Sequence, residues 1–281
     1  MNGFFFVDKD QGKTSFDVVK EIRELTGVKK VGHSGTLDPL ATGLLLVAVG
    51  EATKLLEYLI GCDKEYEVLA RFGVVSDTFD ADGEMREVGE IPELPRSEVL
   101  QKIAECFIGD IFQTPPKYSA LKVSGRRACD IIRSGGEVEL ESRQINVSVF
   151  EIIDWDWPVV RFRVACSSGT YVRSLIHDLG QSLGTGACVE ELRRTKVGEF
   201  SLADVSSKIM PIEDLGRRHF SCIDLSDQEF NGLSDGRSYL NIKIERGAIY
   251  LAFYKEKVVG ILSGVSGGKM KFRKRIFPAL D

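Results

Sequence analysis

The chain has 281 residues, of which 43% are hydrophobic and 28% charged, and its formal net charge is −5 at pH 7. This length and apolar content favour one large domain with a small one, each able to bury a core. No run of about 18 apolar residues occurs, which excludes a membrane-spanning helix, and the first residues do not resemble a secretory signal peptide. We therefore expect a cytoplasmic protein.

The cysteines are scattered and form no close CxxC pair. This spacing favours reduced thiols over a disulfide framework or a zinc site, so we expect no metal. Most of them are expected to be small core residues. The six are Cys62, Cys106, Cys129, Cys166, Cys188 and Cys222.

Charge is distributed unevenly along the chain. Residues 76–110 hold ten acidic and three basic side chains, whereas residues 113–134 hold five basic side chains opposed only by Asp130. A second basic cluster occupies residues 269–275. Phosphate binding depends on local potential rather than on net charge. The basic segments therefore indicate either a nucleic-acid partner or two solvated charged surfaces, and net charge does not decide between them.

In the first part of the chain, residues 4–7 form a short apolar run typical of a buried strand. Ser15 is a plausible N-cap for a helix whose inward stripe has helical spacing. That stripe consists of Val18, Val19, Ile22 and Leu25. Residues 32–43 predict an irregular loop, residues 44–49 a buried strand, and residues 64–73 a strand with partial alternation.

Residues 75–95 are acidic and punctuated by glycine and proline, which predicts surface turns. Ser97 can cap a helix, and the basic segment that follows it ends at Gly135-Gly136. The remaining elements are predicted from apolar periodicity. They are strands at 145–153 and 159–166, a helix after Gly169-Thr170 with Val172, Leu175, Ile176 and Leu179 inward, and strands at 248–254, 258–262 and 270–277.

Strands and helices alternate without a regular βαβ order, so we predict an α+β fold with a mixed, largely antiparallel central sheet and flanking helices. The pattern of predicted elements changes near Pro211, beyond which short β-rich segments occur. We expect a large domain over residues 1–210, with an insertion at about 113–136, and a small β-rich domain over residues 211–281. No internal repeat or low-complexity linker is present.

The loop at residues 32–43 contains the most informative residues of the chain. Three glycines and a proline disfavour a helix interior and allow backbone geometries that other residues avoid. Such a loop before a buried strand can present a side chain on a rigid support, and the candidates are His33 and Asp38. An Asp-Pro pair is also an ordinary turn signal. From these residues alone, both interpretations of Asp38 stay open.

This loop, GHSGTLDPLATGLL, resembles the catalytic motif of the TruB family of tRNA pseudouridine synthases. Further segments resemble that family in the same order along the chain. They are residues 9–15 (KPxGxTS), 64–66 (KxY), 115–125 (PPxYSAxKxxG), 169–180 (GTYxRSLxxDLG) and 192–198 (LRRTxxG). Two positions depart from the pattern: Asp10 replaces a usual proline, and Cys129 stands where tyrosine is common.

The resemblance implies the pseudouridine synthase fold followed by a small PUA-like domain. It also implies that the T-loop uridine of tRNA, position 55, is isomerised by breaking its N-glycosidic bond and rejoining uracil through C5. This reaction involves no redox change, net hydrolysis or group donor, so no cofactor is expected. The expected partner is the tRNA T-arm, with no obligate protein partner, and the expected state is a monomer.

Three catalytic residues follow from the resemblance. Asp38 is the essential carboxylate, Arg173 pairs with it and holds it charged, and Tyr66 stacks on the target uracil and serves in proton transfer. Two of these have an ordinary alternative: Arg173 as a surface helix residue, and Tyr66 as a core tyrosine with a satisfied hydroxyl.

The resemblance also implies residues that contact RNA. His33 is associated with holding the opened RNA loop, Leu192 with an apolar wall of the pocket, and the basic insertion with gripping the T-arm phosphates. The ordinary alternatives are a loop histidine, a core leucine and a solvated surface. The full set is His33, Lys9, Lys64, Leu192, Lys117, Lys122, Arg126 and Arg127.

Three other functions remain as alternatives. The first is an RNA-binding protein or RNA-folding chaperone, and the second is a guide-RNA-dependent synthase of the related archaeal and eukaryotic branch. The third is a glycosylase, which also combines a carboxylate with base flipping.

Overall fold

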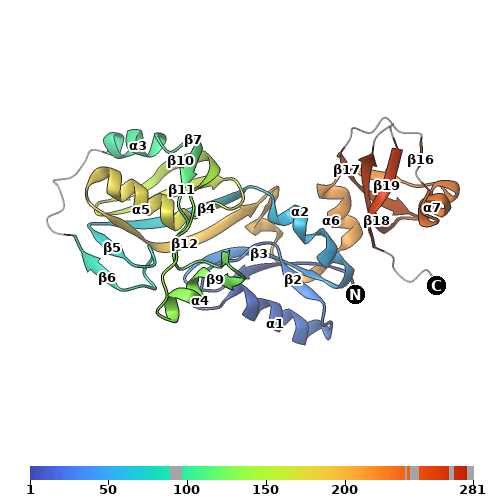
Figure 1. Ribbon diagram of the computed structural model, residues 1–281, viewed down its shortest axis with the longest axis horizontal. Coiled ribbons are helices and arrows are strands. Elements are labelled where there is room, and N and C mark those ends of the chain that lie inside the picture. The colour runs from blue at the N-terminus through green and yellow to red at the C-terminus, as the bar shows by residue number, and fades with distance from the viewer. Residues whose placement is uncertain (89–96, 238, 241–246, 266–268, 277–281) are drawn as a thin grey trace.

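A computed structural model describes residues 1–88, 97–237, 239–240, 247–265 and 269–276. The molecule is elongated, with a large sheet at one end and a smaller sheet at the other (Figure 1). The large sheet has ten strands, and only the β12–β3 pair within it is parallel. The predicted mixed, largely antiparallel α+β fold is therefore confirmed.

Eight strands form the main path of the large sheet. In spatial order they are β14 (Ser206–Pro211), β1 (Gly3–Lys9), β3 (Thr42–Val49), β12 (Ala187–Val197), β4 (Lys64–Phe72), β11 (Val159–Cys166), β10 (Arg143–Asp156) and β7 (Gly109–Gln113). Two short strands, β2 (Val31–His33) and β13 (Phe200–Ser201), pair with β3 and β12. The strands expected at residues 4–7, 44–49, 64–73, 145–153 and 159–166 are all present.

Helix α1 (Ser15–Thr26) differs from its prediction at both ends. Its N-cap is Thr14, whose side chain accepts a hydrogen bond from the Asp17 amide in a capping box, so the expected cap at Ser15 was wrong. Leu25, expected to face inward, is 69% exposed. The buried stripe therefore ends one turn earlier than the apolar pattern suggests.

Helix α5 (Val172–Leu183) matches its prediction, because all four of its expected inward residues are buried. It packs against β12. Helix α1 is equally long, and the remaining helices before residue 211 are shorter. They are η1 (Gly50–Leu55), α2 (Leu56–Ile60), α3 (Ser97–Glu105), α4 (Ala128–Arg133) and η2 (Leu202–Asp204).

The acidic segment is more ordered than the predicted surface turns. It forms a hairpin of β5 (Val74–Ser76) and β6 (Met85–Glu87), and Asp80 between these strands is only 3% exposed. The predicted turns are present between the two strands, but their placement at the surface was wrong for Asp80, because the sequence pattern did not reveal its buried partner. Residues 89–95 lie outside the described residues.

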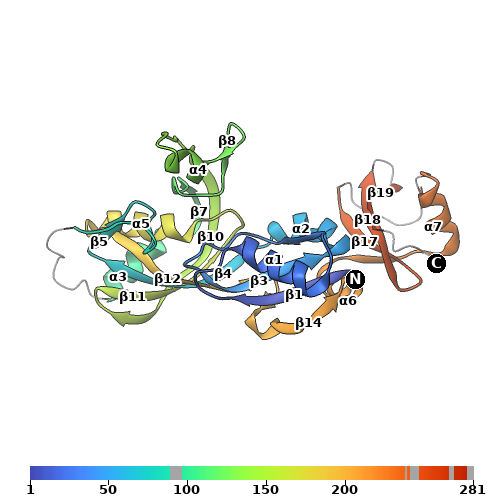
Figure 2. The ribbon, with the colours of Figure 1, turned by 90° about the horizontal axis from the view of Figure 1, so that it is seen from below.

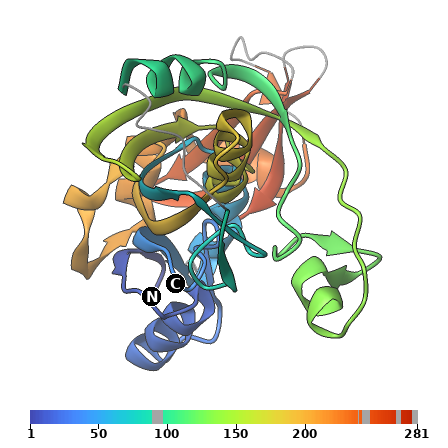
Figure 3. The same cartoon turned by 90° about the vertical axis from the view of Figure 1, so that its left-hand side faces the viewer.

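The basic insertion projects from the large sheet. Its strands β8 (Lys122–Val123) and β9 (Arg126–Arg127) pair with each other, and α4 follows them directly. Figure 2 shows this piece standing away from the sheet beyond β7 and β10, and Figure 3 shows it to one side of the molecule. Such a projection can reach a partner that the sheet itself does not contact.

The C-terminal part forms a five-stranded sheet. Its strands, in spatial order, are β15 (Cys222–Asp224), β17 (Ile249–Tyr254), β18 (Lys257–Val265), β19 (Lys269–Arg275) and β16 (Tyr239–Leu240). Helices α6 (Ile212–His219) and α7 (Asp227–Ser234) accompany it. One core cluster unites Phe4 and Leu46 of the large sheet with Leu251 and Phe253 of the small one. The expected strand end at Phe277 lies outside the described residues.

All six cysteines are free. Only Cys166 and Cys188 are buried, whereas Cys106 is exposed and the other three are half-buried. The expectation that most are core residues was therefore wrong, since many of them lie in turns and at helix ends rather than on inward faces.

Candidate active site

The loop between β2 and β3 is fastened to helix α1. The Ser15 hydroxyl accepts a hydrogen bond from the Leu37 amide at 2.8 Å and donates one to the Leu37 carbonyl at 3.2 Å. The Ala41 amide closes a turn onto the Asp38 carbonyl at 3.1 Å. The Asp38 carboxylate thus stands on a fixed turn, with its side chain 36% exposed.

Arg173, in the first turn of α5, connects this loop to two other segments. Its Nη2 lies 2.9 Å from Asp38 Oδ2, and its Nη1 lies 3.2 Å from Asp80 Oδ2. The guanidinium also donates to the Thr78 carbonyl at 2.8 Å and the Tyr118 carbonyl at 3.0 Å. Its side chain is 5% exposed, so the alternative of a surface helix arginine does not hold.

Asp80 is a member of this cluster that sequence reasoning missed. It accepts hydrogen bonds from the Thr78 hydroxyl at 2.6 Å and the Asp82 amide at 3.1 Å. Burial raises the pKa of the Asp80 carboxyl, and these donors and Arg173 oppose that rise. No sequence signal separates Asp80 from its acidic neighbours.

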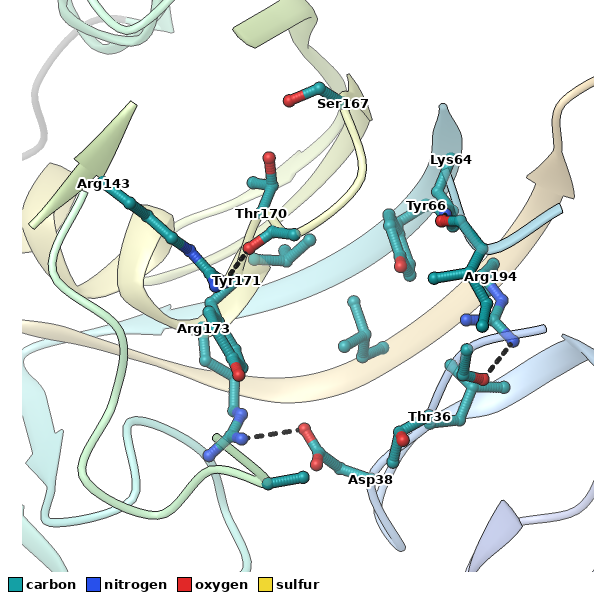
Figure 4. A pocket seen from close by; sticks show the side chains of 17 residues that line it. Thr36, Asp38, Lys64, Tyr66, Arg143, Ser167, Thr170, Tyr171, Arg173 and Arg194 are labelled. Carbon is teal, nitrogen blue, oxygen red and sulfur yellow. Dashed lines mark hydrogen bonds and ion pairs between the residues drawn. The ribbon is translucent and has the colours of Figure 1, made fainter. Parts of the chain in front are cut away.

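Asp38, Tyr66 and Arg173 line one pocket of about 270 Å³. Figure 4 shows their side chains around the same cavity, with Asp38 and Arg173 joined at one side. Tyr66 lies on β4 and Leu192, also in the lining, on the neighbouring β12. Burial raises the pKa of the Tyr66 phenol, so its hydroxyl is protonated at neutral pH.

A second, larger groove of about 1050 Å³ meets the pocket at Asp38 and Arg173, which line both. His33, Tyr118 and Arg127 line only the groove. Asp38 therefore lies where the pocket meets the larger groove. This arrangement suits a nucleotide whose base enters the pocket while the rest of its strand lies in the groove.

His33 is held as a neutral imidazole. Its Nδ1 accepts a hydrogen bond from the Gly35 amide at 3.3 Å, which places the proton on Nε2. Burial, followed by the charge of Arg194, lowers the pKa of His33. The His33 side chain lines the groove in this uncharged form.

Three buried cations surround the site. The Lys9 ammonium donates to the Asp10 and Lys13 carbonyls at 2.9 and 2.7 Å and is not among the residues that line the pocket or groove. Lys64, which lines the pocket, donates to the Ile60 carbonyl at 2.5 Å. Burial lowers the pKa of both lysines.

Arg194 is the third buried cation, 1% exposed, and it also lines the pocket. It donates to the Leu44 carbonyl at 2.7 Å and the Gly35 carbonyl at 3.3 Å, so it ties both ends of the loop that carries Asp38 to β12. Arg194 lies within the matched LRRTxxG motif, but sequence reasoning assigned it no role.

Tyr171 and Arg143 also line the pocket and were missed. The Tyr171 backbone is fixed by Gln113, which accepts from its amide at 2.8 Å and donates to its carbonyl at 3.0 Å. The Arg143 guanidinium lies 4.9 Å from the centre of the Tyr171 ring. The available signal for Tyr171 was its place beside Arg173 in the matched motif.

The four basic residues predicted in the insertion are all exposed, and they lie outside the pocket. They are Lys117, Lys122, Arg126 and Arg127. Arg127 forms an ion pair with Asp130 at 2.8 Å, and Arg126 donates to the Ser134 hydroxyl at 3.2 Å. In the part of the chain that the structure describes, no cluster of side chains fits a metal ion and no helix is long and apolar enough to span a membrane.

Solved structures with a similar overall fold include one titled "Crystal Structure of a Cbf5-Nop10-Gar1 Complex". It superposes with a TM-score of 0.72 at 26% identity over 98% of this chain and 85% of that one. A structure titled "Structure of H/ACA RNP bound to a substrate RNA containing 2'-deoxyuridine" gives a TM-score of 0.71 at 24% identity, covering 98% of this chain and 85% of that one. The fold is thus that of the pseudouridine synthases.

Two family profiles match the chain: the N-terminal domain of TruB family pseudouridylate synthase at residues 23–172, and the C-terminal domain of tRNA pseudouridylate synthase B at residues 173–220. The tRNA pseudouridine synthase B of Opitutus terrae is 44% identical over 222 residues, covering 78% of this chain and 92% of that protein. That of Clostridium tetani is 44% identical over 202 residues, covering 72% and 70%. The chain belongs to the TruB family, and it is an isomerase.

Proposed function

We propose that this enzyme binds tRNA and converts the T-loop uridine at position 55 to pseudouridine, with Asp38 as the essential carboxylate. The observation that carries the proposal is the Asp38–Arg173 ion pair at 2.9 Å, which lies at the mouth of a pocket lined by Tyr66. The names of the relatives support tRNA as the substrate.

Arg173 fixes the direction of the Asp38 carboxylate through the ion pair that joins them at 2.9 Å. The carboxylate acts at the sugar or base of the target uridine as its C–N bond breaks. The freed uracil turns within the pocket and rejoins the sugar through C5, and the hydrogen on C5 then leaves. We assign this proton transfer to Tyr66, which stacks on the base. Its hydroxyl accepts the C5 proton as it releases its own, and the released proton ends on N1, so the number of protons is unchanged.

A uridine inside a folded loop must be extruded before it can enter the pocket, at a cost of a few kcal/mol. We assign His33, in the adjoining groove, to holding the opened RNA loop. Leu192 forms an apolar wall for the base. Lys64 contributes positive charge to the same pocket, and Lys9 acts indirectly, by fixing the turn at residues 10–13 that leads into helix α1.

The projecting insertion grips the T-arm through phosphate contacts from its exposed basic residues. We further propose that residues 1–210 form the catalytic domain and that residues 211–281 form a small PUA-like domain that also binds RNA. The enzyme acts as a monomer in the cytoplasm, with no obligate protein partner and no cofactor.

The test is the variant Asp38→Asn on a T-arm transcript. Pseudouridine formation should fall at least about a thousandfold, while RNA binding should stay near the wild-type level. Asp156→Asn, which removes an exposed carboxylate that lines neither the pocket nor the groove, is the control and should keep its activity. Turnover by Asp38→Asn at the wild-type rate would overturn the catalytic assignment.

The same transcript distinguishes the alternatives. A chaperone or simple RNA-binding protein would bind it without forming pseudouridine. A guide-dependent synthase would need an added guide RNA, whereas the proposed enzyme modifies the transcript alone. A glycosylase would release free uracil.

A further inference from the structure

Cys62, His219 and Glu199 form a relay outside the candidate active site. The Cys62 Sγ lies 3.5 Å from His219 Nε2, and His219 Nδ1 lies 2.9 Å from Glu199 Oε1. Cys62 follows α2, Glu199 lies between β12 and β13, and His219 ends α6. Three separate segments thus bring a thiol, an imidazole and a carboxylate into line.

The relay adjoins the pocket without lining it, since the pocket-lining Lys64 donates a hydrogen bond to the Cys62 carbonyl. Cys62 packs against the core cluster that joins the large sheet to the C-terminal sheet, whereas Tyr66 and Leu192 belong to the other core cluster. None of the three relay residues lines the pocket or the groove. The proposed isomerisation therefore leaves this cluster unused.

The imidazole is held in place and remains accessible. Its ring contacts Phe200 and Phe220, with ring centres 5.4 and 5.0 Å apart, and the His219 side chain is 19% exposed. Cys62 is half-buried, and both of its neighbours in the chain, Gly61 and Asp63, are exposed. A small reagent can therefore approach the sulfur.

The geometry supplies a base for the thiol. When the Glu199 carboxylate accepts the Nδ1 hydrogen, the Nε2 lone pair faces Cys62, the arrangement that activates a nucleophile in hydrolytic triads. Burial raises the pKa of the Cys62 thiol, so little free thiolate exists without a proton acceptor. Of the charges facing the sulfur, Lys64 favours the thiolate, whereas Asp63 and Glu199 oppose it.

We propose that Cys62 is a modification site that reacts with low-molecular-weight disulfides. His219 takes the thiol proton, and the Cys62 sulfur attacks one sulfur of the disulfide. A new S–S bond forms as the S–S bond of the reagent breaks. The departing thiolate takes the proton from the His219 imidazolium, so that atoms, charge and electrons balance.

The other cysteines lack this relay. Cys106 is the most exposed thiol and contacts the Lys102 carbonyl at 3.4 Å, just as Cys62 contacts the Tyr58 carbonyl at 3.5 Å in addition to His219. Cys129 contacts the Asp130 carboxylate at 3.8 Å rather than a histidine. Among the described residues, only Cys62 has a histidine nitrogen within hydrogen-bond distance. Reactivity at Cys62 therefore depends on its base, whereas reactivity at Cys106 depends on exposure.

The first test is the rate of alkylation by iodoacetamide at pH 7, measured for each cysteine by peptide mass spectrometry on the whole protein. In His219→Gln, Cys62 should react at least about tenfold more slowly, because the general base is removed. Cys106 in the same sample is the internal control and should keep its rate. Glu199→Gln keeps the imidazole and removes its orienting carboxylate, so a smaller slowing at Cys62 is expected.

Should His219→Gln fail to fold, as judged by circular dichroism, Glu199→Gln alone decides the result. An unchanged Cys62 rate, relative to Cys106, in the folded variants would overturn the proposal. The second test uses oxidised glutathione. One adduct should form at Cys62 and be absent from Cys62→Ser, whereas an adduct formed mainly at Cys106 or Cys129 would contradict the proposed site.

Discussion

The Arg173 guanidinium bonds to the Asp38 carboxylate at 2.9 Å while its other terminal nitrogen lies 3.2 Å from Asp80. The Asp38 side chain is 36% exposed at the pocket mouth, whereas the Asp80 side chain is buried behind it. The arginine is thus held from behind by one carboxylate and presents its charge to the other. This arrangement leads to the first two predictions.

Replacing Asp80 by asparagine should lower the turnover rate by roughly tenfold to a hundredfold with little change in KM, because Arg173 loses the partner that fixes its direction. Single-turnover rates on a T-arm transcript measure this effect. Asp156→Asn is the matched control, since it removes an exposed carboxylate that lines neither the pocket nor the groove. Equal rates for Asp80→Asn and the wild type would show that Arg173 is held adequately without it.

Replacing Arg173 by methionine should destabilise the fold by about 3–5 kcal/mol, because it leaves the Asp80 carboxylate buried without a cation. Urea unfolding monitored by fluorescence gives the free energy. The double variant Arg173→Met/Asp80→Asn should recover part of this loss, since it removes the unpaired charge. If the loss of stability in the double variant equalled the sum of the losses in Arg173→Met and Asp80→Asn, a direct interaction of these side chains would be contradicted.

Removing the exposed charges of Lys117, Arg126 and Arg127 by alanine substitution should flatten the salt dependence of tRNA binding. The slope of log K against log salt should fall by about 0.7–0.9 for each phosphate that the protein no longer neutralises. Arg127 already pairs with Asp130, so its contribution to the slope should be the smallest of the three. A triple alanine variant at the exposed Lys29, Lys102 and Lys208 is the charge-matched control, and an equal flattening there would place the RNA elsewhere.

Asp178 predicts a pH-dependent stability. Burial raises the pKa of this carboxyl from 3.8 to about 6. Between these values the folded state binds more protons than the unfolded state, so the contribution of Asp178 to stability falls as pH rises, and its charge is unfavourable at pH 7. Asp178→Asn should therefore be more stable than the wild type at pH 7, and its advantage should vanish below about pH 4. Urea midpoints at several pH values test this, and a variant less stable at pH 7 would contradict it.

Local sequence patterns predicted helices and strands well where one face of the element packs against the core and the opposite face does not. The stripe of α5 and the alternation of β4 were read correctly, because their periods match the geometry of helix and strand. The start of α1 was not, since Thr14 and Ser15 are both good caps. Ser15 is instead used by the Leu37 backbone, a contact between residues 22 positions apart.

The candidate site was predicted unevenly for a similar reason. Asp38, Tyr66 and Arg173 were named through their motifs, and the structure brings them to one pocket. Asp80 was placed on a solvated surface, because a run of acidic residues usually is one. The Asp80 carboxylate can be buried only because Arg173 approaches it from α5. Lys9 was expected at the RNA, yet its ammonium is enclosed by backbone carbonyls.

Short motifs and local periodicity were enough to indicate the family of this protein, its α+β class and the three residues at the centre of its pocket. The pairing of its charges, in contrast, became visible only in the folded chain. Ion pairs and buried polar contacts join residues far apart in the sequence, such as Asp38 with Arg173 or Cys62 with His219. Their energies depend on burial and distance, and neither is fixed until the sheet and helices have packed.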